Sequence, residues 1–188
     1  MEKQPSHFYT GKGDRGDTAR LGGAARLPKS AALLETIGTL DEATCAIGLA
    51  RAHARDAALR GALPKVQRHL YQLMSHLSAT PETREQYPGV AEADVAWLEA
   101  QIAALEADVP PLRDFVLPGE SVAGAACHMA RAVIRRAERG LVAFTETEPG
   151  VLPPNLAYAN RLSSLMFVAA LREDHLAGSE PRLAREAQ

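Results

Sequence analysis

The sequence contains few of the residues that point to a secreted, membrane-spanning or zinc-binding protein. Only two of its 188 residues are cysteines, Cys45 and Cys127, so neither a disulfide framework nor a cysteine-based zinc site can be assembled. We expect both to be buried as small hydrophobic residues, because each falls in an apolar helical stretch. No signal peptide is recognisable, and no apolar run approaches the ~18 residues of a membrane-spanning helix. These absences favour a reducing compartment, most simply a bacterial-type cytoplasm.

An excess of charge of either sign is also missing. The chain has 21 Lys and Arg against 23 Asp and Glu, a net charge of −2 at pH 7. This balance argues against nucleic-acid binding over a large surface, so any anion site must be local. The Glu-x-x-His pairs of carboxylate-bridged di-metal bundles do not occur. His69 and His76 lie two helical turns apart, without the i, i+4 spacing that chelates a metal ion.

Helical periodicity accounts for most of the chain. Apolar residues recur every three or four positions in five segments, which we expect to be helices: residues 30–53, 64–80, 91–109, 121–148 and 153–173. Pro64 suits a first helical turn, and Ser121 suits an N-cap. No segment shows a convincing strand alternation. The sequence therefore predicts an all-α, five-helix up-and-down bundle in a single domain, 1–188, with a loose N-terminus (1–9) and a disordered tail (174–188).

The polar side of the fourth predicted helix carries concentrated charge. Arg131, Arg135 and Glu138 stand at i, i+4 and i+7, within about 60° of one another around the helix axis. Further cationic or potentially cationic residues extend this side: His128, Arg136 and Arg139. Such a face is either a solvated surface on which Glu138 pairs with the arginines, or a preformed anion site whose guanidinium groups bind phosphate oxygens.

A glycine-rich loop, residues 10–18, nearly fits two well-known phosphate-binding motifs. Gly11, Gly13 and Gly16 have the G-x-G-x-x-G spacing, but too little chain precedes them for a strand, and Pro28 interrupts the helix that should follow. The P-loop pattern fails because Asp17 stands in place of its lysine. Neither motif is therefore assigned.

The physical chemistry of this loop nevertheless suits an anion. Glycines allow tight turns that direct several backbone N–H groups at one ligand, and Thr10 and Thr18 add hydroxyl donors. Asp14 could bind Mg²⁺ directly or through water. An ordinary flexible loop is the alternative from these residues alone.

The order of these features resembles the PduO-type ATP:cob(I)alamin adenosyltransferases, or corrinoid adenosyltransferases, from Tyr9 to about Arg172. The resemblance rests on six segments: Tyr9-Thr10-x-x-Gly13-Asp14-x-Gly16-x-Thr18, Gly22-Gly23 with Arg26-x-Pro28-Lys29, Gly38-Thr39-Leu40-Asp41-Glu42, Phe115-Val116-Leu117-Pro118-Gly119, Arg131-x3-Arg135-Arg136-Ala137-Glu138-Arg139, and Asn160-Arg161-Leu162-Ser163. It implies a homotrimer with active sites between neighbouring subunits. The implied reaction transfers the 5′-deoxyadenosyl group of ATP to the cobalt of cob(I)alamin, giving adenosylcobalamin and triphosphate.

The resemblance also implies roles for individual residues. ATP would be bound by two groups: Thr10, Gly11, Lys12, Gly13, Asp14, Thr18 and Lys29 near the N-terminus, and Arg135, Arg136, Glu138, Arg139 and Asn160 on two helices. The implied catalytic set is Asp41, Arg131, Arg135 and Glu138. Asp41, which by spacing alone is either a partner for an arginine or an exposed charge, would pair with Arg131 of the adjoining subunit. Phe115 would lie against the lower face of the corrin and exclude the axial ligand, and Mg²⁺ would be held mainly through the ATP phosphates.

Four departures from the family pattern bear on nucleotide affinity and loop order. Lys12 is displaced by one position, Glu120 replaces a second glycine, Ser164 replaces an aspartate, and Thr44-Cys45 replaces the commoner Leu-Asn. A cobalamin reductase and an adenosylcobalamin-dependent enzyme are compatible partners, whereas nucleic acid and membrane are not expected. Two alternatives remain: a trimer that binds ATP or corrinoid without turnover, and a helical module whose basic face binds acidic partners or RNA.

Overall fold

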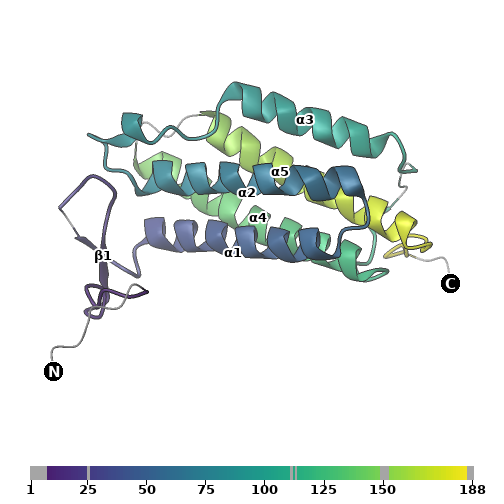
Figure 1. Ribbon diagram of the computed structural model, residues 1–188, viewed down its shortest axis with the longest axis horizontal. Coiled ribbons are helices and arrows are strands. Elements are labelled where there is room, and N and C mark those ends of the chain that lie inside the picture. The colour runs from purple at the N-terminus through teal and green to yellow at the C-terminus, as the bar shows by residue number, and fades with distance from the viewer. Residues whose placement is uncertain (1–7, 25, 111, 113, 149–152, 186–188) are drawn as a thin grey trace.

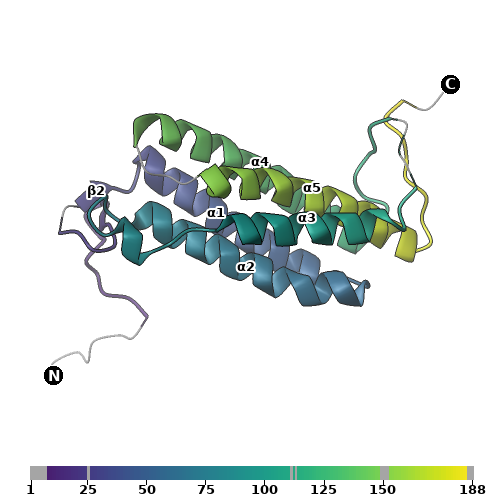
Figure 2. The ribbon, with the colours of Figure 1, turned by 90° about the horizontal axis from the view of Figure 1, so that it is seen from above.

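A bundle of helices forms the body of the protein (Figure 1). The computed structural model describes residues 8–24, 26–110, 112, 114–148 and 153–185. Its elements are β1 (Asp17–Ala19), β2 (Arg26–Pro28), α1 (Ala32–His53), α2 (Ala57–Ser78), the 3₁₀ turn η1 (Arg84–Gln86), α3 (Glu92–Glu106), α4 (Val122–Thr147) and α5 (Pro153–Leu176). Successive helices alternate in direction, so the predicted five-helix up-and-down bundle is confirmed (Figures 1 and 2).

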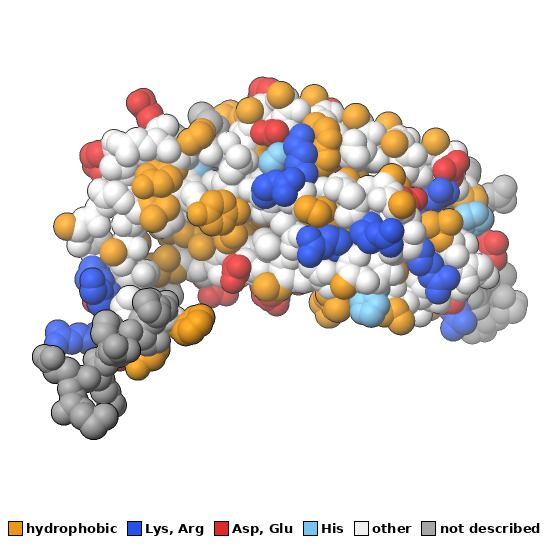
Figure 3. All heavy atoms as spheres, viewed as in Figure 1, with side chains coloured by type: hydrophobic (Ala, Val, Ile, Leu, Met, Phe, Trp, Pro, Cys, Tyr) orange, Lys and Arg blue, Asp and Glu red, His pale blue; other side chains and the backbone are white. Residues whose placement is uncertain are grey.

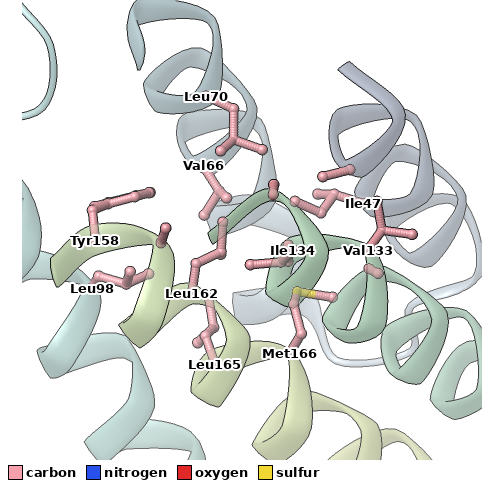
Figure 4. Close-up of a cluster of buried hydrophobic side chains, with 14 of the residues drawn as sticks. Ile47, Val66, Leu70, Leu98, Val133, Ile134, Tyr158, Leu162, Leu165 and Met166 are labelled. Carbon is pink, nitrogen blue, oxygen red and sulfur yellow. The ribbon is translucent and has the colours of Figure 1, made fainter. Parts of the chain in front are cut away.

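The hydrophobic core lies around α4, which packs against both α1 and α5. Val133 and Ile134 of α4 face buried side chains of neighbouring helices (Figure 4). Those neighbours include Ile47 of α1, Val66 and Leu70 of α2, and Leu162, Leu165 and Met166 of α5. The apolar stripe of α4 thus explains its central position, since a helix buries the face on which its apolar residues recur.

α1 and α4 approach each other closely where a glycine leaves room. A Cβ atom added to Gly140 of α4 would lie 2.6 Å from Thr36 Oγ1 of α1. Thr36 is itself buried, and its hydroxyl donates to the carbonyl of Ala32 at 2.9 Å. The packing of α1 on α4 therefore requires a residue without a side chain at position 140.

Two buried acids at the end of α5 organise the opposite end of the bundle from β1 and β2. Glu173, fully buried, accepts hydrogen bonds from the backbone N–H groups of Arg55 (2.8 Å) and Asp56 (3.0 Å). Asp174 accepts from Ser121 Oγ at 2.7 Å, and Ser121 Oγ in turn accepts from Gly124 N at 2.9 Å, the predicted N-cap of α4. The end of α5 thus holds the starts of α2 and α4 in place.

Several local predictions are wrong. α2 begins at Ala57 rather than Pro64, because Asp56 caps it by accepting from Leu59 N at 2.9 Å, and Pro64 lies inside the helix. Cys45 is exposed, although Cys127 is buried as predicted. The strands β1 and β2 were missed, since three residues are too few to show an alternation.

The expected disordered tail is also structured over residues 174–185. α5 continues to Leu176, and the chain then returns beside the segment that precedes α4. Ala184 N donates to the carbonyl of Phe115 at 2.7 Å, and Leu117 N to that of Arg182 at 2.8 Å. These backbone hydrogen bonds stabilise the segment, although its sequence lacks the apolar periodicity of a helix. Residues 1–7 and 186–188 lie outside the described residues.

We expect Gly140→Ala to destabilise the fold by about 1–3 kcal/mol, because the added methyl group overlaps Thr36 across the α1–α4 contact. Gly61→Ala is the matched control, since Gly61 lies exposed within α2 and a methyl group added there would meet no atom within 4 Å. That control should be stabilised by up to about 1 kcal/mol. Urea unfolding of both variants tests the pair, and equal effects would contradict the packing argument.

Candidate nucleotide site

The glycine-rich loop consists of consecutive tight turns carried by a small hairpin. Asp14 N donates to the carbonyl of Gly11 at 3.2 Å, and Gly16 N to that of Gly13 at 3.1 Å. Gly11 and Gly16 have φ angles of 68° and 81°, a region that residues with a Cβ atom rarely adopt. β1 and β2 then pair antiparallel. The loop therefore has a defined backbone, unlike the flexible loop that its composition alone allows.

Two basic residues of the hairpin behave differently. Arg26 is engaged within the loop, because its Nη2 donates to the Lys12 carbonyl (2.8 Å) and to Asp17 Oδ1 (2.9 Å). The hydrogen bond from Arg26 also lowers the pKa of Asp17. Lys29 N donates to the Gly16 carbonyl at 2.8 Å, and its ammonium lies beside Gly13, 3.0 Å from a Cβ placed there. Among the described residues the Lys29 ammonium forms no salt bridge, although its charge contributes to the lowered pKa of Asp17.

The remaining predicted residues of the loop lie at the surface. Thr10, Lys12 and Asp14 are exposed and Thr18 is half-buried. Thr10 Oγ1 accepts from Lys12 N at 3.3 Å. Within the described part of the chain, no three or more His, Cys, Asp or Glu residues form a group that could hold a metal ion. A single carboxylate, Asp14, fits a Mg²⁺ ion bound mainly by phosphate oxygens.

On α4, the acid of the charged face is not paired with the arginines next to it. Glu138 Oε1 accepts from Asn160 Nδ2 of α5 at 2.8 Å, and Asn160 Oδ1 accepts from Arg161 Nη1 at 2.7 Å. Arg135 is exposed, and in the described chain its guanidinium has no acidic partner. Arg139 donates to the backbone carbonyl of Arg135 at 3.0 Å and forms no salt bridge within the described residues. Among the described residues, Glu138 therefore forms no salt bridge with the neighbouring arginines of α4.

α1 lies beside the charged face of α4 and carries two consecutive acids, Asp41 and Glu42. Arg136 forms a salt bridge with Glu42 of α1. Asp41, the preceding residue, is exposed and has no ion pair among the described residues. Arg131 is half-buried, and its Nε lacks a hydrogen-bond partner in the described chain. Asp41 and Arg131 thus do not pair within one chain.

One residue predicted on the polar side of α4 lies in the interior. His128 is buried, 5.9 Å from the Phe167 ring in an edge-on arrangement, and neither ring nitrogen has a hydrogen-bond partner in the described chain. Phe167 also lies 5.9 Å from the guanidinium carbon of Arg131. Burial lowers the pKa of His128, the charge of Arg131 lowers it further, and Asp174 opposes the shift. His128 is therefore an uncharged neighbour of Arg131 rather than a further surface charge.

The hairpin group of predicted nucleotide residues and the predicted corrin residue, Phe115, lie at opposite ends of the bundle. The β1–β2 hairpin is at one end, and the segment between α3 and α4, which contains Phe115, is at the other (Figures 1 and 2). α4 alone has 26 residues, a length of about 39 Å. The Phe115 side chain is 80% exposed. Val109 and Leu112, earlier in the same connecting segment, line an apolar cavity of about 340 Å³ together with Phe167 of α5. One chain therefore cannot bring its own hairpin to its own Phe115.

Basic side chains also gather over α2 and the adjoining part of the surface (Figure 3). α2 contributes Arg60, Lys65 and Arg68 and contains no acid. Lys65 Nζ lies 4.1 Å from the centre of the Trp97 ring. This cation–π interaction stabilises the ammonium group without a bound anion. Because no glycine turns with N–H donors accompany these residues, we place the candidate anion site at the hairpin and on α4.

Taken together, these features define a helical-bundle protein with a candidate anion site: glycine turns beside Lys29, and a face of α4 on which Arg135 and Arg139 form no salt bridge in the described chain. The sequence profile of the cobalamin adenosyltransferase family matches residues 8–173. The chain belongs to the cobalamin adenosyltransferase family, which confirms the resemblance seen in its motifs.

Known relatives agree with this assignment. The corrinoid adenosyltransferase PduO of Citrobacter freundii is 38% identical over 171 residues, which cover 89% of this chain and 50% of that protein. The chain thus spans about half the length of that relative, but 84% of the corrinoid adenosyltransferase of Bacillus subtilis, which is 37% identical. A variant PduO-type ATP:corrinoid adenosyltransferase from Lactobacillus reuteri, complexed with cobalamin and ATP, superposes with a TM-score of 0.86 at 29% identity, covering 95% of this chain and 99% of that one. No described helix is long and apolar enough to cross a membrane.

We expect the free energy of unfolding to fall as the pH decreases below about 6.5, the ordinary pKa of histidine, because His128 has a lowered pKa in the folded state. The unfolded state then binds more protons than the folded state, which favours unfolding. His128→Leu should reduce this loss, while His53→Leu, at an exposed position, should not. Urea unfolding at about pH 7.5 and about pH 5.5 checks this; an unchanged pH dependence in His128→Leu would contradict it.

Proposed function

We propose that the protein transfers the 5′-deoxyadenosyl group of ATP to the cobalt of cob(I)alamin, giving adenosylcobalamin and triphosphate. The observation that carries this proposal is a set of cationic donors that form no salt bridge within the described chain of a member of this family. Lys29 beside Gly13 provides one part of that set, and Arg135 and Arg139 on α4 provide the other. The solved relative complexed with cobalamin and ATP supports the choice of substrates.

In the proposed reaction the protein supplies no nucleophile. The Co(I) electron pair forms the bond to C5′ of ATP, and the C5′–O5′ bond breaks with its electrons leaving on the triphosphate. The protein must hold C5′ in line with cobalt and stabilise the charge that develops on the leaving group. Backbone N–H groups of Gly11 and Gly13, hydroxyls of Thr10 and Thr18, and the Lys29 ammonium are suited to that charge.

The second group of predicted residues would complete the nucleotide pocket. Arg135 and Arg139 would bind phosphate oxygens through their guanidinium forks, with Arg136 beside them. Glu138, whose carboxylate is held by Asn160, would orient the nucleotide together with that amide. Lys12 and Asp14 belong to the glycine-rich loop and are exposed there. Mg²⁺, when bound, would neutralise part of the phosphate charge, with Asp14 as its protein ligand.

The site is completed, we propose, in a homotrimer whose active sites lie between subunits. The separation of hairpin and Phe115 within one chain supports this assembly, because ATP and cobalamin must meet. Asp41 and Arg131, which have no acidic or basic partner within the described chain, would pair across the interface. Exposed apolar side chains on α4, such as Met129 at 60% exposure, are suited to burial there.

Phe115 would lie against the lower face of the corrin. Its ring is apolar and exposed, so it can exclude an axial ligand from cobalt and favour four-coordinate cob(II)alamin, which is easier to reduce. We place the activity in the cytoplasm, where a cobalamin reductase would supply the reduced substrate and an adenosylcobalamin-dependent enzyme would take the product. Neither nucleic acid nor a membrane enters the proposal.

Arg135→Ala should lower the transfer rate by about a hundredfold or more, because it removes a charged donor to the leaving triphosphate. The assay is anaerobic: chemically reduced cob(I)alamin, Mg²⁺ and ATP, with the visible spectrum and triphosphate followed together. Arg68→Ala, at an exposed position on α2, should remain close to wild type. Near-normal activity of Arg135→Ala would refute the phosphate role, and a wild type that binds ATP without releasing triphosphate would indicate a carrier or sensor instead.

Phe115→Ala should reduce adenosylation more strongly when the reaction starts from cob(II)alamin and a reductase than when it starts from cob(I)alamin. The reason is that excluding the axial ligand assists the reduction but not the attack on C5′. We expect a difference of about tenfold or more between the two losses. Leu117→Ala, an exposed apolar residue of the same segment, serves as control. Equal losses in both assays would eliminate the lower-face role.

A further inference from the structure

The glycine hairpin is attached to the bundle beside the end of α2. Leu21, shortly after β1, donates its N–H to the Ser78 carbonyl at 2.9 Å, and Thr80 N donates to the Leu21 carbonyl at 3.1 Å. Gly22 lies directly against Thr83, where any added Cβ would overlap the side chain. The position of the hairpin relative to the helices therefore depends on the short stretch that follows β1.

Arg20, the first residue of that stretch, connects the ends of two helices. Its Nη1 and Nη2 donate to Glu148 Oε1 (2.7 Å) and Oε2 (3.0 Å), a two-pronged contact with the C-cap residue of α4. Nη2 also donates to the Ala79 carbonyl at 2.6 Å, at the end of α2. Arg84 of η1 forms a salt bridge with the same Glu148 carboxylate. We call Arg20, Glu148 and Arg84 the hairpin clamp.

The clamp is well shielded from water, so its charges matter more than those of ordinary surface pairs. The side chains of Arg20, Glu148 and Arg84 are 12%, 21% and 7% exposed. Burial raises the pKa of Glu148, but hydrogen bonds from Arg20 and Arg84 outweigh it, and the net shift is downward. The carboxylate is therefore ionised at neutral pH. Without its charge, the two shielded guanidinium groups would lose the carboxylate that bridges them.

The geometry points to Glu148 and Arg20 as positioning residues for the nucleotide: the clamp fixes where the hairpin holds Gly13 and Lys29, and thereby sets the affinity for ATP. Neither residue would touch the substrate. This inference rests on the proposed function, because it assumes that the triphosphate binds at the hairpin. Since misplacement of a binding group by about 1 Å can cost a hundredfold, loosening the attachment should weaken ATP binding while the bundle remains folded.

The test uses Glu148→Gln, with Arg20→Lys as a second variant that keeps a positive charge but loses the two-pronged contact. In both we expect the KM for ATP to rise by about tenfold, while the KM for cob(I)alamin and the kcat at saturating ATP change by less than about twofold. Hydrogen exchange of residues 10–29 should become faster, and exchange in the core of α4 should not change. Glu146→Gln, an exposed acid of the same helix end, is the matched control and should behave as wild type.

An unchanged KM for ATP in folded Glu148→Gln would overturn the inference and leave the clamp a purely structural feature. An equal rise in the KM of both substrates would also overturn it, since that indicates general loosening. If wild type has no transferase activity, the proposed function fails separately, and calorimetry with MgATP tests the positioning role. Weaker ATP binding by Glu148→Gln than by wild type supports that role. Equal binding by the two proteins, or no binding by wild type, refutes it.

Discussion

The packing of α4 between α1 and α5 is the interaction on which the rest of the structure depends. One side of α4 consists of small and branched apolar residues. At Gly140, α1 lies so close that a methyl group added to this glycine would overlap the Thr36 side chain. Because this side is committed to the core, Arg135 and Arg139 must face outward, at a spacing set by the helix. Glu148, the C-cap residue of the same helix, binds Arg20. Core packing, the arginine face and the attachment of the hairpin are therefore properties of one element.

The distribution of charge separates structural from functional residues. Buried or shielded acids have defined partners: Glu173 accepts from backbone N–H groups, Asp174 from Ser121, and Glu148 from Arg20. By contrast, the Lys29 ammonium and the exposed Arg135 guanidinium form no salt bridge among the described residues. Unpaired cations persist in a folded protein without penalty only where water or a ligand solvates them. Because the chain has a net charge of −2, we place the candidate nucleotide site where such cations lie beside glycine turns or share one helix face, and not where basic residues are merely numerous.

Most of the fold could be predicted because it depends on local periodicity. The helices α1, α3, α4 and α5 begin and end close to the predicted residues, and Ser121 is the N-cap of α4. The start of α2 was wrong, since the capping by Asp56 outweighs the preference of Pro64 for a first turn. The ordered segment after α5 was missed because its hydrogen bonds connect Ala184 to Phe115, far away in the sequence.

For the candidate site, the sequence by itself determined the chemical types of the groups: glycine turns, a lysine, guanidinium forks on one helix and an aromatic residue before α4. It could do so because turn geometry and helix spacing are local. Only the tertiary structure decided their surroundings. Glu138 binds Asn160 instead of the arginines, His128 is buried, and Arg20 meets Glu148, 128 residues away. Those outcomes depend on how each helix is rotated against its neighbours, and no local pattern encodes that rotation.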